Sequence, residues 1–270
     1  MAKKIIAFIV IVLVLAAAFC ASYKLSDKYW DKLAPMLGIE EPANEMPDAV
    51  PAVATPTEAP TTTVPATTEE EITFPSFLSS ATVEMPTDET WKLILLNRSY
   101  KVAESYVPEL APALEGSAIQ LDARVAAEFR KMYNAAKEDG VELTPVSGYV
   151  STEIQQALFD QKVEELTAEG VADGSAIFLA SETVLPGGCC EDNIGISVSI
   201  GMQVDSFAQS DAYRWLKDNA AKYGFIERYT AEKKAFTQVT ARPWYWRYVG
   251  TEAAEAMKQT GACLEEYLQQ

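Results

Sequence analysis

The sequence predicts an α+β fold, in which helices flank a small antiparallel sheet behind an apolar N-terminal helix and a disordered linker. Two observations predict this class. Segments with a helical spacing of apolar residues mix with short strand-like runs, without the regular alternation of a parallel α/β protein. The 270 residues are 49% hydrophobic, with five Trp and twelve Tyr, which suffices for a sizeable core in one or two domains.

The N-terminus predicts a membrane segment. Two lysines precede an unbroken apolar run over residues 5–21, which fits either a secretory signal or an anchor that is not cleaved. We favour the anchor, with residues 1–4 as a cytoplasmic tip and residues 5–22 crossing the membrane, because no clean cleavage site follows. Cys20 is a poor lipidation site because the bulky Phe19 precedes it. In either case the rest of the chain is expected outside the cytoplasm, so we expect a single-pass protein of the cell membrane with an extracytoplasmic C-terminal domain.

Residues 23–38 are a mixed juxtamembrane segment, and residues 39–90 read as a linker. The linker is rich in Pro, Thr, Ala and Glu and has no Lys or Arg. It lacks the apolar area that offsets chain entropy, so we expect it to be disordered and extended.

The folded domain is expected over residues 91–270. Residues 122–140 form a predicted helix with Gly140 as its cap, and residues 151–170 form a second with Ser151 as the N-cap. A third helix is predicted over residues 211–225, and a terminal helical segment over residues 251–268. Strands are predicted at residues 91–98, 141–150, 194–202 and 243–250.

Charge and composition exclude some functions. The 22 basic and 39 acidic residues give a formal net charge of −17, which argues against a nucleic-acid partner because phosphates need a basic surface. The chain contains no histidine at all, so any metal or acid–base chemistry must use other groups.

A set of motifs in the folded domain resembles the VanY-type D-alanyl-D-alanine carboxypeptidases. They occur in order and with compatible spacing over residues 91–268, and each alone is a weak signal. The motifs are YVPEL (106–110), AKEDGVEL (136–143), SGYVS (147–151), LPGGCCEDNIG (185–195), YRWLKDNAAKYGFIERY (213–229), PWYWRYVG (243–250) and CLEEYL (263–268).

The resemblance implies a D,D-carboxypeptidase/hedgehog-like fold and a zinc peptidase that removes the terminal D-alanine from peptidoglycan stem peptides. In that family, His, Asp and His bind zinc, and a Glu acts as general base on the zinc-bound water. Zinc prefers such nitrogen and carboxylate ligands and keeps one position open for water.

Carried onto this chain, the resemblance places other residues at these positions. Asp192 and Tyr245 stand at the two His positions, Ser199 at the Asp position, and Arg242 at the position of the base. The arginine expected to meet the substrate carboxylate is replaced by Val150. Neutral hydroxyls are poor zinc ligands and arginine does not act as a base, so we expect no metal, no zinc cofactor and an inactive site.

The surrounding frame is kept, and it predicts a binding groove. The residues expected to line it are Ser147, Tyr149, Gln155, Trp244 and Trp246, although at least one of the two tryptophans is expected in the core. We further expect an ion pair between Arg242 and Asp192, with Tyr245 hydrogen-bonding nearby. For the outer domain we prefer a disulfide between Cys189 and Cys263, with Cys190–Cys263 as the alternative.

Three functions stay open at this point. The first is a tethered pseudopeptidase that binds a peptidoglycan stem peptide or a cell-envelope protein without hydrolysis. The second is an active metal-dependent D,D-carboxypeptidase with an atypical site, and the third is a purely structural spacer.

Overall fold

The computed structural model describes residues 80–269, and it confirms the α+β class with a small antiparallel sheet. The predicted tip, anchor and juxtamembrane segment, and the linker up to residue 79, lie outside the described residues. Among the described helices, none is both long and apolar enough to cross a membrane. The strands are β1 (Ala81–Val83), β2 (Tyr100–Val102), β3 (Leu110–Pro112), β4 (Gln120–Asp122), β5 (Pro145–Ser147), β6 (Ser197–Ile200), β7 (Phe225–Glu227) and β8 (Tyr245–Tyr248).

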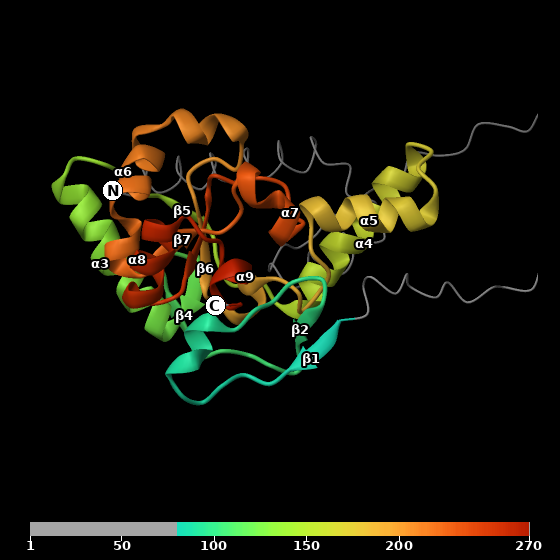
Figure 1. Ribbon diagram of the computed structural model, residues 1–270, viewed down its shortest axis with the longest axis horizontal. Coiled ribbons are helices and arrows are strands. Elements are labelled where there is room, and N and C mark those ends of the chain that lie inside the picture. Colours follow the sequence, from blue (N-terminus) through green and yellow to red (C-terminus); the bar gives the residue numbers. More distant parts are fainter. Residues whose placement is uncertain (1–79, 270) are drawn as a thin grey trace, which may run out of the picture. The chain divides into compact units, whose positions relative to one another are not determined.

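Helices account for most of the remaining regular structure (Figure 1). The α-helices are α3 (Ala123–Glu138), α4 (Thr152–Ala168), α5 (Asp173–Thr183), α6 (Asp211–Asn219), α7 (Lys234–Thr237), α8 (Thr251–Thr260) and α9 (Leu264–Tyr267). The 3-10 helices are η2 (Glu89–Leu93), η3 (Glu191–Ile194), η4 (Asp205–Gln209), η5 (Ala220–Tyr223) and η6 (Ala231–Lys233).

The central sheet has the strand order β5-β6-β8-β7, and all its neighbours are antiparallel. Because side chains alternate across a strand, its two faces differ in chemistry. Val198 of β6 pairs with Trp246 of β8, and both are buried in the core. Ser199 pairs with Tyr245 on the opposite face. The sheet therefore has one apolar core face and one polar face.

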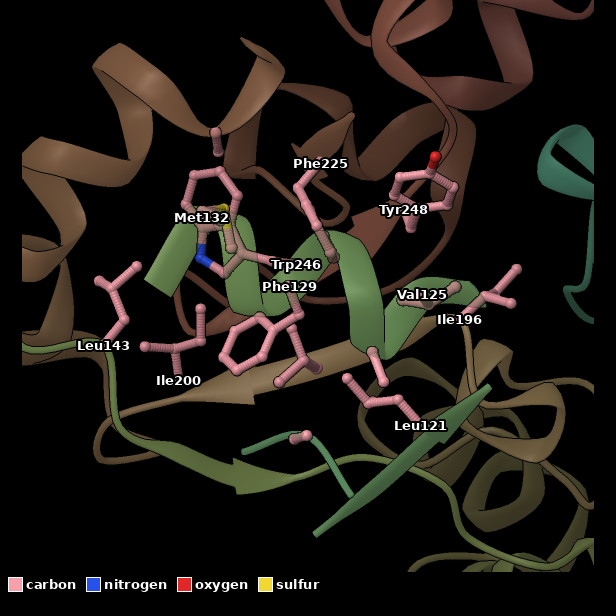
Figure 2. Close-up of a cluster of buried hydrophobic side chains, with 14 of the residues drawn as sticks. Leu121, Val125, Phe129, Met132, Leu143, Ile196, Ile200, Phe225, Trp246 and Tyr248 are labelled. Carbon is pink, nitrogen blue, oxygen red and sulfur yellow. The ribbon is translucent and has the colours of Figure 1, made fainter. Parts of the chain in front are cut away.

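The core is built between the apolar face of the sheet and α3. Figure 2 shows Phe129 and Met132 of α3 beside Ile200 and Trp246 of the sheet. The helix forms as its sequence predicts, because its apolar residues recur at helical spacing and Asp122 caps it by accepting a hydrogen bond from the Arg124 backbone N–H (3.0 Å).

Two helices, α4 and α5, pack against each other as a hairpin beside the sheet (Figure 1). Helix α4 begins where predicted, because the Ser151 hydroxyl accepts a hydrogen bond from the Ile154 backbone N–H (3.2 Å). Helix α5 was not predicted. Its sequence, DGSAIFLASET, carries apolar residues on all sides and gives no clear helical period.

Three predictions about element boundaries need correction. Residues 91–98 do not form a strand, because Asp88 caps the short helix η2 that runs through Leu93. The folded part begins before Trp91. Strand β1 lies inside the stretch assigned to the linker, and it pairs in parallel with β2. The terminal helix is two helices, α8 and α9, separated at Gly261, whose φ of +69° is left-handed.

Candidate functional site

The polar face of the sheet brings together the three positions to which the resemblance assigns metal ligands. Ser199 lies opposite Tyr245 in the register of β6 and β8, and Asp192 approaches them from η3. Gly195 makes this approach possible. It ends η3 with φ +69°, and a Cβ there would stand only 2.6 Å from the Asp122 backbone nitrogen.

Four side chains form a hydrogen-bonded group at this place, which we call the Asp192 cluster: Cys190, Asp192, Ser197 and Tyr245. The Tyr245 hydroxyl donates to Asp192 Oδ1 (2.9 Å) and also lies 2.9 Å from Ser197 Oγ. The Ser197 hydroxyl donates to the same carboxylate oxygen. The Cys190 thiol lies 3.5 Å from Asp192 Oδ2 and 3.5 Å from the Tyr245 hydroxyl. The carboxylate is thus surrounded by neutral donors.

Burial sets the protonation of this cluster. It raises the pKa of Asp192 to about 6, although the hydrogen bonds from Ser197 and Tyr245 act in the opposite direction. Burial, reinforced by the nearby Asp192 carboxylate, also raises the pKa of Tyr245 and of Cys190 well above their ordinary values. At neutral pH the cluster therefore holds one carboxylate, with a protonated phenol and a protonated thiol beside it.

A second group, the Glu191 cluster, lies next to the first and is made of Glu191, Arg228, Arg247 and Glu265. Glu191 is fully buried and accepts a hydrogen bond from Arg228 Nε (2.6 Å), while Arg247 Nη1 stands 3.2 Å away. Arg228 also makes a two-pronged contact with Glu265, at 2.7 and 2.9 Å. Burial alone would raise the pKa of Glu191, but the two guanidinium groups outweigh it and hold the pKa below the ordinary value.

Arg242 does not form the predicted ion pair with Asp192. Among the ion pairs of residues 80–269, neither residue is a partner of the other. The Arg242 guanidinium instead donates to the Thr183 carbonyl and lies over the rings of Tyr229 and Tyr245, at 5.3 and 5.9 Å from their centres. The loop before β8 directs Arg242 toward the end of α5, whereas the predicted hydrogen bond from Tyr245 to Asp192 is confirmed.

The residues predicted to line a groove are placed in different surroundings. Ser147 pairs with Ser199 across β5 and β6 and is half-buried, so it borders the site. Tyr149 is also half-buried, and burial raises its pKa. Gln155 is buried and donates to the Leu185 carbonyl (2.6 Å), which gives its amide a structural role.

The two tryptophans differ in burial, although residues two positions apart share a face of a strand; Trp244 lies just before β8, which begins at Tyr245. Trp246 is buried in the core and donates to the Pro243 carbonyl (3.0 Å), so its prediction as a groove residue is wrong. Trp244 is half-buried and packs against both the core and the apolar residues around Cys190. Val150, at the position of the substrate-binding arginine, does lie beside the site, because its backbone N–H donates to the Asp192 carbonyl (3.1 Å).

The predicted disulfide is not formed. Cys189, Cys190 and Cys263 are all free thiols and all buried. Cys189 Sγ lies 3.3 Å from the Ser80 hydroxyl. Cys263 directly precedes α9 and lines a cavity that neither Cys189 nor Cys190 lines. Neither proposed pairing with Cys263 is therefore formed in the structure.

The donor set at the three ligand positions does not fit zinc. It offers one carboxylate and two hydroxyls, and the chain has no imidazole to add. A phenol and a thiol must lose their protons to bind zinc well, and here both have raised pKa values. Within residues 80–269, no three His, Cys, Asp or Glu side chains stand together as a set that could hold a metal ion.

Sequence reasoning missed the residues that surround Asp192. Ser197 and the whole Glu191 cluster were not predicted as parts of the site. One signal was available, because Ser197 and Ser199 alternate in the strand ISVSI and must share a face with the residues opposite them. No local signal pairs Glu191 with Arg228 and Arg247, which lie 37 and 56 positions further along the chain.

Comparisons with known proteins place this geometry in context. The profile of the family described as "VanY: D-alanyl-D-alanine carboxypeptidase" matches residues 118–251. A D-alanyl-D-alanine carboxypeptidase of Enterococcus faecalis (strain ATCC 700802 / V583) is 37% identical over 185 residues, covering 68% of each chain. The putative carboxypeptidase YodJ of Bacillus subtilis (strain 168) is 34% identical, covering 66% of this chain and 67% of the relative.

Solved structures agree with this result. The structure of VanYB in complex with D-alanine-D-alanine is 37% identical, with a TM-score of 0.58, and the match covers 66% of this chain and 98% of VanYB. The LdcB LD-carboxypeptidase, whose structure is described as revealing the molecular basis of peptidoglycan recognition, is 28% identical, with a TM-score of 0.59, over 70% of this chain and 90% of LdcB.

Proposed function

This chain belongs to the VanY family of D-alanyl-D-alanine carboxypeptidases, and on that premise we propose that it binds D-alanyl-D-alanine ends of peptidoglycan peptides without hydrolysing them. The relatives support the choice of ligand, since VanYB binds D-alanine-D-alanine and LdcB recognises peptidoglycan. The half-buried Ser147 and Tyr149 supply polar groups beside the site for such a peptide.

The chemistry of the Asp192 cluster is the main support for a protein that does not hydrolyse the peptide. Peptide hydrolysis at such a site needs a water made nucleophilic by a metal or by a base. The cluster presents hydroxyl and thiol donors around a single carboxylate, and a cationic side chain, Arg242, stands at the position of the base. Its guanidinium is moreover directed to the Thr183 carbonyl.

A second candidate is an active metal-dependent D,D-carboxypeptidase with an atypical site. Its support is the 37% identity with a named carboxypeptidase over two thirds of both chains. In that case Asp192 is the group to act as the base, since a pKa of about 6 lets it accept a proton near neutral pH.

The apolar run at residues 5–21 and the linker after it complete the proposal. We place the domain outside the cytoplasm, held to the cell membrane by that run, where peptidoglycan or a protein of the cell envelope is within reach. No nucleic-acid partner is proposed, because the chain carries a net charge of −17.

The test combines binding and product analysis on the full-length chain. A stem peptide ending in D-Ala-D-Ala is titrated by calorimetry in the presence of Zn²⁺ and of a chelator, and released D-alanine is measured by mass spectrometry. We expect equal binding in both conditions and no release. Zinc-dependent release of D-alanine supports the second candidate, and an absence of binding in both conditions overturns the proposal.

A matched pair of variants locates the binding. Ser147→Leu places a bulky side chain beside Ser199 and is expected to weaken binding by about tenfold, the equivalent of one lost charge-assisted hydrogen bond. Val146→Leu adds a similar change at the neighbouring position, whose side chain is exposed and which does not pair with β6, so it is expected to leave the affinity unchanged.

A further inference from the structure

A cavity of about 510 Å³ is lined by none of the residues of the Asp192 cluster. It is bounded by α5, by α7 with the residue that ends it, and by the segment before β2. None of its lining residues belongs to either cluster described above. They are Arg98, Phe178, Glu182, Lys234, Ala235 and Gln238.

Arg98 is the unusual residue of this cavity. It is only 4% exposed, and its Nε is buried without a hydrogen-bond partner. The nearest carboxylate of the lining, Glu182, is engaged by Lys234 at 3.0 Å, and Arg98 forms no ion pair within residues 80–269. Burial accordingly lowers the pKa of Arg98. A buried charge without a counter-charge is costly, so the guanidinium favours any anion that reaches it.

Gln238 holds this guanidinium in place. Its backbone carbonyl accepts from Arg98 Nη2 (2.7 Å), and its side-chain oxygen stands 3.5 Å from Nη1. Gln238 adopts φ +58°, and among the described residues it is the only one other than glycine with a positive φ. This conformation costs free energy in a residue with a side chain, and it directs two acceptors to the Nη1 and Nη2 end of Arg98, whose guanidinium lies over the Phe178 ring, 4.8 Å from its centre. Nε has no hydrogen-bond partner among the described residues, although it is buried.

The charges of the cavity select the ligand. Arg98 and Lys234 are cationic and Glu182 is anionic, so the lining carries one uncompensated positive charge. One negative charge balances it, whereas the Glu182 carboxylate repels a dianion such as phosphate. Phe178 and Ala235 give the rest of the lining an apolar character.

We propose that this cavity is a binding site for a small monocarboxylate with a short apolar substituent. The carboxylate pairs with the Arg98 guanidinium and with Lys234, and the substituent lies against Phe178 and Ala235. The proposal is independent of the function proposed above, because it shares no residue with the Asp192 cluster and requires no hydrolysis.

Calorimetry on the full-length chain tests the site, with propionate as the probe and propionamide as its neutral counterpart. Propionate is expected to bind at least about tenfold more tightly, because only the anion makes a charge-assisted contact with the buried guanidinium. Equal binding of the two probes, no binding of propionate, or tighter binding of inorganic phosphate overturns the proposal.

Variants on the rim give opposite responses. Glu182→Gln removes the competing carboxylate and frees Lys234, so propionate binds several-fold more tightly, and Lys234→Gln binds it several-fold less tightly. Lys131→Gln, on the exposed face of α3, is the control and leaves binding unchanged. Because a gain of affinity in Glu182→Gln cannot come from misfolding, its absence contradicts the proposal even where Arg98 variants fold poorly.

Discussion

Glu191 and Asp192 are adjacent in the chain, yet the structure treats their carboxylates in opposite ways. Glu191 is fully buried and meets two guanidinium groups, so its pKa lies below the ordinary value. Asp192 meets only hydroxyl and thiol groups, so burial raises its pKa to about 6. The difference shows that charge neutralisation, and not burial alone, decides the protonation of each carboxylate.

The two clusters also differ in what they do for the fold. The Glu191 cluster ties η3, the residue after β7, β8 and α9 together through paired charges, which is a structural role. The Asp192 cluster lies on the polar face of the sheet, at the positions to which the resemblance assigns the metal ligands. Variants in the Glu191 cluster therefore test the stability of the fold, and variants in the Asp192 cluster test the candidate site.

The largest effect is expected in the Glu191 cluster. Glu191→Gln keeps the shape of the side chain but leaves Arg247 without its acidic partner in a fully buried place. We expect the free energy of unfolding to fall by about 3–5 kcal/mol, as for other buried pairs that lose one partner. Denaturant unfolding followed by circular dichroism measures this change.

The control for that variant is Glu128→Gln, which removes an acidic partner at the surface of α3. It is expected to change the free energy of unfolding by less than about 1 kcal/mol. If the two variants lose the same amount, the paired charges around Glu191 do not hold the frame together.

A smaller effect of opposite sign is expected in the Asp192 cluster. The pKa of Asp192 is raised in the folded state from 3.8 to about 6, so its contribution to stability is full below pH 3.8 and is lost as the pH rises through 6. Asp192→Asn does not titrate. Its stability relative to the wild type should therefore rise by about 1–2 kcal/mol between about pH 4 and pH 8, after a reduction for partial exposure.

Denaturant unfolding of both proteins across this pH range measures the difference. A difference that stays constant with pH would mean that Asp192 has an ordinary pKa and that neutral donors do not control it. Glu191→Gln should not show the same rise in stability relative to the wild type over this pH range, because the pKa of Glu191 in the wild type lies below the ordinary value.

The smallest effect concerns Tyr245. Tyr245→Phe removes one hydrogen bond from the Asp192 carboxylate, which raises the pKa of Asp192 further and lowers the stability by about 1 kcal/mol. The side-chain carboxyl ¹³C signal of Asp192 reports its pKa directly. Tyr229→Phe is the matched control, because that hydroxyl donates to Glu191 (3.0 Å), and it should leave the Asp192 titration where it is.

Much of the fold could be predicted because local signals agree with the tertiary structure. The helix at α3 has apolar residues at helical spacing and an Asp122 cap, and α4 has its Ser151 cap. Local signals fail where packing decides. Helix α5 has no apolar period, and residues 91–98 look like a strand although Asp88 turns the chain into η2.

The positions of the site were predicted better than its contacts. The resemblance placed Asp192, Ser199 and Tyr245 at one site, and the sheet register does bring them together. The expected contact of Arg242 with Asp192 and the disulfide of Cys263 failed. Both depend on side-chain directions and on the packing of distant elements, which spacing along the chain does not determine.

Metal content tests most directly whether this family member keeps the VanY fold without the zinc chemistry. The full-length chain is dialysed against buffer with micromolar Zn²⁺, together with the combined variant Asp192→His, Ser199→Asp, Tyr245→His and Arg242→Glu. Bound zinc is then counted by mass spectrometry. We predict that the natural chain retains no stoichiometric zinc and that the variant retains about one ion per chain, as expected for two His ligands and one Asp. Stoichiometric zinc on the natural chain that is lost in Asp192→Asn would contradict the account.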